Sequence, residues 1–165
     1  MMTSAQLQTL KSAIAADGAL NAQPMNSDGA FAIAAALNQI ATPDFFVWRS
    51  SLEVGEIMQN GFDWTRVDNL TAGKARIWDW MMRTGTVRPQ QANVRAGVLA
   101  TFGVAADQST RLAVFTHFQR QATRVEKLFA TGAGTAATEA GVGPAVMTFE
   151  GQIDYQSVDQ ARAIP

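Results

Sequence analysis

The 165-residue sequence predicts a mainly α-helical protein with five or six helices in a small bundle, a long loop rich in Gly, Ala and Thr, and a short C-terminal β element. Apolar residues recur at spacings of three and four along most of the chain, which is the helical period. Capping residues and glycines stand where such helices would begin and end. Only residues 145–150 alternate like a strand. The length favours a single domain over 1–165, with 131–165 as an extension of loop, strand and short helix.

The first two helices are predicted from their caps and apolar spacing. One begins at Ser4 and ends at Asp17, before a glycine. The second begins at Ser27 or Asp28 and places Phe31 among its apolar residues. Residues 44–58 that follow remain open, because their aromatic and β-branched content favours a strand whereas the spacing of their last apolar residues favours a helix.

Three longer helices are predicted further along. The first starts after Thr71 and ends at Gly85, and the second spans residues 88–103. The longest spans 108–131, where six apolar residues repeat at spacings of three and four. A short final helix over 154–163 follows the predicted strand, with Asp154 or Ser157 as its cap.

Charge is sparse and unevenly distributed. Only 16% of the residues are charged, against about 25% in typical globular domains. The net charge is −4 over residues 1–65, +6 over 66–127 and −3 over 128–165. This pattern suits head-to-tail contact between copies, or a basic face turned towards a polyanion, although ion pairs within one fold would also cancel it. The sequence has no cysteine, no signal peptide and no apolar run long enough to cross a bilayer, so we expect a soluble protein that is not secreted.

The glycine-rich stretch 127–144 contains a G-x-G-x-x-A pattern, which is typical of nucleotide-binding turns. A nucleotide turn follows a strand and opens a helix, whereas here a predicted helix precedes the glycines and a strand follows. We therefore expect a mobile joint at 131–144 that becomes ordered on assembly. The joint would let the strand 145–150 add to a neighbouring chain, which makes Val146, Thr148 and Phe149 candidate interface residues.

The most aromatic segment is "RIWDWMMR", residues 76–83. On a helix, Trp80 lies on one side and Trp78 and Met82 lie on another. Burial of both tryptophans would then require the core and a second surface, so Trp78, Trp80 and Met82 are candidate interface residues. The alternative is that both tryptophans belong to one core.

Arg120, Arg124 and Lys127 would form a basic stripe along the helix 108–131. Such a stripe contacts a protein partner, faces nucleic acid, or is simply solvated, and we favour a protein partner. His117 is the only histidine and is interpreted as a residue at the edge of the core. The sequence nominates no catalytic residue, no cofactor site and no metal ligand, and we expect that the protein is not an enzyme.

Several segments together resemble a family of tailed-bacteriophage virion proteins over roughly residues 5–163. The resemblance is carried by "TPDFFVWRS" (42–50), "DWTRVDNLTAGKARIWDWMMRTG" (63–85), "NVRAGVLATFG" (93–103), "RQATRVEKLFATGAGT" (120–135) and "MTFEGQIDYQSVDQAR" (147–162). It implies a structural protein of the virion, synthesised in the host cytoplasm. A small helical protein with an extension is similar in plan to head–tail adaptor (connector) proteins, which form rings under the portal.

The implied partners are copies of the same chain, the portal and tail or neck proteins, with packaged DNA nearby and no membrane. The alternatives are another virion protein, such as a tail terminator, tail completion or minor capsid protein, and thirdly a small enzyme.

Overall fold

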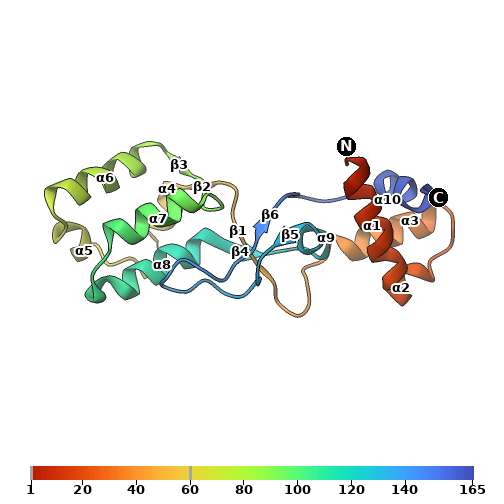
Figure 1. Cartoon of the computed structure of the whole chain (residues 1–165), viewed down its shortest axis with the longest axis horizontal. Coiled ribbons are helices and arrows are strands. Elements are labelled where there is room, and N and C mark those ends of the chain that lie inside the picture. The colour runs from red at the N-terminus through yellow and green to blue at the C-terminus, as the bar shows by residue number, and fades with distance from the viewer. Residues whose placement is uncertain (1, 60) are drawn as a thin grey trace. The chain divides into compact units, whose positions relative to one another are not determined.

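The computed structural model describes residues 2–59 and 61–165 (Figure 1). The protein is 53% helical, with ten α-helices and three two-stranded sheets in these ranges. The mainly α-helical class predicted from the sequence is therefore confirmed. The helices are more numerous and shorter than the five or six that we expected.

The chain folds into two compact units. The terminal unit contains the residues up to Asp44, with Gln121–Ala130 and Met147–Pro165, and the central unit contains Phe45–Arg120 and Thr131–Val146. The predicted extension 131–165 is thus divided between the units. The terminal unit carries a net charge of −3 and the central unit carries +2.

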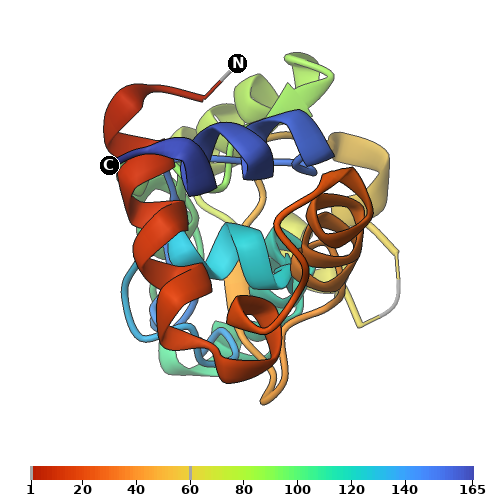
Figure 2. The ribbon, with the colours of Figure 1, turned by 90° about the vertical axis from the view of Figure 1, so that its right-hand side faces the viewer.

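The terminal unit is built from five helices: α1 (Ser4–Ala16), α2 (Gly18–Asn21), α3 (Ser27–Leu37), α9 (Arg124–Leu128) and α10 (Tyr155–Ala163). Figure 2 shows α10 in blue beside α1 in red and α3 in orange. Their core consists of buried aliphatic residues with Phe129, and the largest members from the helices are Leu10, Ile14, Leu20, Ile33, Leu37, Val125 and Val158.

Short polar side chains start these helices, close to the predicted positions. Thr3 and Asn26 cap α1 and α3, one residue earlier than the nearest caps predicted from the sequence. Asp154 caps α10, because its side chain accepts the Ser157 N–H at 2.7 Å. Each cap satisfies a backbone donor that the helix itself leaves unpaired.

The central unit begins with the segment 44–58, which contains both structures that its sequence left open. It forms β1 (Phe46–Trp48), β2 (Leu52–Glu53) and α4 (Val54–Ile57). The remaining elements of this unit are α5 (Thr65–Asp68), α6 (Ala72–Arg83), β3 (Thr86–Val87), α7 (Ala92–Thr101), a 3₁₀ turn (Ala105–Asp107) and α8 (Gln108–Phe118).

The sheets of the protein are small. β2 pairs antiparallel with β3, with Leu52 opposite Val87, and β1 pairs with β4 (Gln119–Gln121). The two remaining strands, β5 (Ala130–Thr131) and β6 (Val146–Met147), pair with each other.

The helix predicted over 108–131 is wrong in its extent, because α8 ends at Phe118. The carbonyl of Phe118 accepts the N–H of Arg49 at 2.9 Å, and the residues after it form β4. A new helix, α9, then begins with a capping box between Thr123 and Glu126. Because α8 and α9 each bury one apolar face, the helical spacing of apolar residues continues from one to the other. The sequence pattern therefore does not reveal the break between them.

The glycine-rich stretch is a packed loop and not the mobile joint that we expected. The N–H of Phe46 donates to the carbonyl of Gly134 at 2.8 Å, and the N–H of Ala145 donates to the carbonyl of Phe46 at 2.9 Å. Gly141 is buried with φ +69°, and a Cβ there would lie 2.8 Å from Cζ of Phe115. These glycines therefore allow close approach of the loop to neighbouring rings and backbone.

Candidate functional site

Helix α6 presents one tryptophan to the core and another to solvent. Thr71 has the extended backbone of an N-cap, although its side chain makes no capping bond, and the helix ends before Gly85, whose φ is +74°. Trp78 and Trp80 are two residues apart, which places them about 200° apart around the helix. Accordingly, Trp78 is 3% exposed and Trp80 is 76% exposed.

The inner side of α6 is part of the aromatic core of the central unit. The Trp78 ring stacks on Phe62 with centroids 5.6 Å apart and meets Phe102 edge-on at 4.9 Å. Met82 is half-buried against the same core. The interface role predicted for Trp78 is therefore corrected to a core role, and Met82 packs mainly within its own unit.

The outer side of α6 is apolar at its centre and basic at its edges. Ile77 is 49% exposed and lies one turn before Trp80. Arg76 is exposed and forms none of the ion pairs in the described ranges, whereas Arg83 pairs with Asp79 through Nε and Oδ2 at 2.9 Å. We call Arg76, Ile77, Trp80 and Arg83 the α6 face. An exposed apolar cluster with a charged rim is typical of a protein contact surface.

The predicted basic stripe is not a single helix face. Arg120 is half-buried in β4 of the central unit, whereas Arg124 and Lys127 belong to α9 of the terminal unit. Arg124 Nη2 lies 2.7 Å from Asp17 Oδ2, so the guanidinium charge of Arg124 is paired within the terminal unit. Lys127 and Arg124 line a hollow of about 210 Å³ in this unit.

Asp17 joins this ion pair to the start of α2. Its Oδ1 accepts the N–H groups of Ala19 and Leu20 at 3.0 and 3.2 Å. The hydrogen bond from the Leu20 N–H is the largest cause of a lowered pKa at Asp17. The Ala19 N–H and the Arg124 guanidinium lower this pKa further, whereas desolvation of the carboxyl opposes them.

The predicted strand 145–150 already has partners inside its own chain. The carbonyl of Ala145 accepts the N–H of Trp48 at 2.9 Å, and Val146 lies in β6, which pairs with β5. Thr148 donates to the Phe129 carbonyl through both its N–H, at 3.0 Å, and its hydroxyl, at 2.8 Å. Addition of this strand to a neighbouring chain is therefore not supported, because main-chain groups of Ala145 and Thr148 and the pairing of β6 with β5 are used within the chain.

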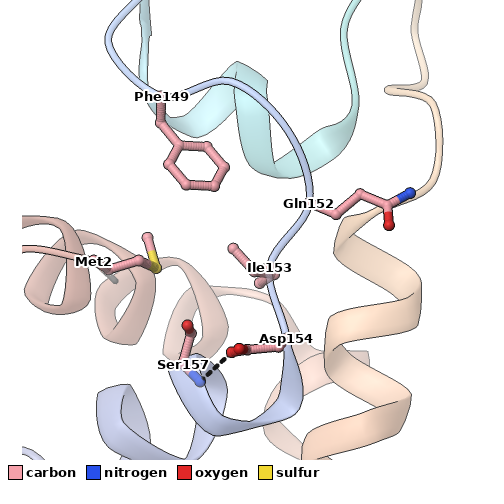
Figure 3. A pocket seen from close by; sticks show the side chains of 6 residues that line it. All are labelled: Met2, Phe149, Gln152, Ile153, Asp154 and Ser157. Carbon is pink, nitrogen blue, oxygen red and sulfur yellow. Dashed lines mark hydrogen bonds between the residues drawn. The ribbon is translucent and has the colours of Figure 1, made fainter.

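Phe149 lies against Phe129 with ring centroids 5.4 Å apart and lines a hollow of about 310 Å³ (Figure 3). Met2 and Ile153 supply apolar lining, and the polar members are Gln152, Asp154 and Ser157. Asp154 accepts the Ser157 N–H as the cap of α10. Hydrogen bonds with Ser157 lower the pKa of Asp154. The carboxylate in this hollow thus serves as a helix cap.

A second exposed apolar surface lies on the terminal unit, where the sequence did not lead us to expect one. Phe31 is 54% exposed and stacks on Tyr155 with centroids 4.2 Å apart, and Met25 is 77% exposed. Asp28 and Asp159 are exposed beside them on the same two helices. We call Met25, Asp28, Phe31, Tyr155 and Asp159 the α3–α10 face.

The sequence predicted Phe31 among the apolar residues of its helix, although Phe31 lies outside the core. The buried face of α3 instead contains Ala30, Ile33, Ala34 and Leu37. Their spacing of three, four and seven is the signal that would have separated Phe31 from the core.

Within the described residues, no group of three or more His, Asp or Glu side chains could hold a metal ion. In the same part of the chain, none of the helices has both the length and the apolar character needed to span a membrane. Comparison of the chain with protein-family models, curated proteins and solved structures found no match.

Proposed function

We propose that this protein is a structural, non-enzymatic component of a tailed-phage particle, and specifically a head–tail adaptor that forms a ring under the portal. The resemblance of its segments to tailed-phage virion proteins supports this assignment. In this proposal the chain is synthesised in the host cytoplasm and functions in the virion, in contact with copies of itself, the portal and tail or neck proteins.

The observation that carries the proposal is the exposure of Trp80 and Ile77 on the outer side of α6. Tryptophan is among the side chains most enriched at the energetic centres of protein interfaces. Here it projects from a helix whose other side is anchored by Trp78 in an aromatic core, which fixes the helix that presents it. An exposed aromatic side chain with a charged rim, presented by an anchored helix, favours a contact surface for another protein.

Packaged DNA is a neighbour rather than a ligand in this proposal. Each phosphate that a channel neutralises adds favourable counterion release, so a strongly basic lumen would retain DNA that has to pass. Arg124 is engaged with Asp17, and Arg83 with Asp79, which limits the charge available to phosphates.

The test is to locate the protein in purified particles of the phage whose genome encodes it. Gold-labelled antibody against the protein should mark the junction of head and tail in electron micrographs, and mass spectrometry should detect the chain in intact particles. Labelling along the tail or over the capsid would support the tail or minor capsid alternatives. Absence from purified particles would exclude a virion role, and free heads and free tails separated from the same lysate serve as controls.

A further inference from the structure

We propose that the α6 face of one copy binds the α3–α10 face of the next copy. This inference rests on the proposed function for its biological setting, a ring, but its chemistry comes from two surfaces of the chain. The α6 face is thus occupied by the α3–α10 face of a second copy, and the α3–α10 face by the α6 face of another.

The two surfaces have similar apolar character and opposite charge. The α6 face presents Trp80 and Ile77 between Arg76 and Arg83 along the helix. Arg83 is paired with Asp79, so Arg76 is the main cation that this face offers to a partner. The central unit to which it belongs has a net charge of +2. An aromatic ring flanked by guanidinium groups suits a partner with aromatic and carboxylate side chains.

The α3–α10 face has those side chains. Exposed Phe31 stacks on half-buried Tyr155. Met25, which adapts easily to other surfaces, lines one pocket with Asp159 and with Arg162, whose guanidinium donates to the carbonyls of Gln23 and Pro24. Asp28 lies one turn before Phe31 on α3, and Asp159 lies one turn after Tyr155 on α10. None of the ion pairs in the described part of the chain involves Asp28 or Asp159.

Contact between two different surfaces is heterologous, so each copy keeps one free surface after binding. Such contacts close into a ring when the rotation allows, and otherwise continue as a filament. The exposed ion pairs would set register and the rate of association, while burial of the aromatic side chains would supply most of the affinity. A lightly charged sequence, with 16% charged residues, fits a chain whose surfaces are covered by neighbours.

The experiment uses two full-length variants that each lose one surface. Trp80→Ser removes the centre of the α6 face, and Asp159→Arg reverses the charge of the α3–α10 face; both side chains are exposed, so the fold is retained. Sedimentation velocity should show concentration-dependent oligomers of the unaltered chain, weakened by added salt. Each variant alone should have a dissociation constant raised at least about tenfold.

The decisive sample is an equal mixture of the two variants. The Trp80→Ser copy keeps an intact α3–α10 face and the Asp159→Arg copy keeps an intact α6 face, so the mixture should form dimers containing one of each and nothing larger. Val104→Ser, at a residue 57% exposed in the central unit, and Gln160→Arg, on an adjoining side of α10, are the matched controls and should assemble normally.

Two results would overturn the inference. The first is an unaltered chain that remains monomeric into the millimolar range at low salt. The second is assembly that persists in either variant, or a mixture of the two that forms no dimers. Neither result affects the location of the chain in phage particles, so failure of this inference and failure of the proposed function are separate outcomes.

Discussion

Replacement of Gly141 by alanine tests whether the glycine-rich stretch is packed against the central unit. Gly141 has φ +69°, and a Cβ would lie 2.8 Å from Phe115 Cζ and 3.2 Å from both Cε atoms. Phe115 is fully buried and meets Trp48 and Phe118 edge-on at 6.1 and 5.9 Å. The ring therefore has little room to move away from an added methyl group.

Two costs add in this variant. A non-glycine residue in the left-handed region costs about 1–2 kcal/mol. Overpacking against a buried ring costs a further 1–3 kcal/mol or so. We therefore expect Gly141→Ala to lower the free energy of unfolding by about 2–5 kcal/mol.

Gly85→Ala is the matched control, because Gly85 has φ +74° and no neighbouring atom within 4 Å of its Cβ position. It carries the backbone cost of about 1–2 kcal/mol without the overlap. Urea unfolding followed by tryptophan fluorescence and circular dichroism would compare the two. If Gly141→Ala were no more destabilising than Gly85→Ala, residues 131–144 would not be packed as described, and the flexible joint expected from the sequence would be restored.

Two further predictions concern the tryptophans of α6 and the carboxyl of Asp17. Trp78→Ala should lower the free energy of unfolding by about 3–5 kcal/mol, because it leaves a cavity in the aromatic core. Trp80→Ala should change this free energy by no more than about 0.5 kcal/mol, because its side chain is exposed. Equal effects of the two variants in urea unfolding would contradict this assignment. Asp17→Asn should destabilise the chain at neutral pH, because the lowered pKa of Asp17 means that its charged form stabilises the fold. That contribution is present above the ordinary pKa of 3.8 and is lost as the pH falls through the lower folded value, so the urea midpoints of the two proteins should converge in acid.

Features that depend on neighbours along the chain could be predicted from the sequence. Apolar period and capping residues predicted the helical class, the end of α6 before Gly85, and a cap at Asp154 or Ser157, of which the structure has Asp154. The two-residue spacing of Trp78 and Trp80 also placed them on different sides of a helix, which the structure confirms. These are local properties, since hydrogen bonds and side-chain contacts within a helix join residues three or four positions apart.

Which side of α6 is buried in the core depends on residues from other parts of the fold. Burial of Trp78 depends on Phe62 and Phe102, and neither is on its own helix. The end of α8 also depends on a distant residue. The carbonyl of Phe118 accepts the N–H of Arg49, and the helix stops there although the apolar period continues.

The glycine-rich stretch 127–144 shows most clearly how residues distant in sequence determine local structure. Composition alone predicts a mobile joint, because glycine and alanine supply little side-chain surface to bury. In the folded chain the same lack of side chains lets Gly141 approach Phe115 and lets Gly134 bond to Phe46. Whether a glycine is flexible or tightly packed depends on residues distant in sequence, and that information exists only once the chain has folded.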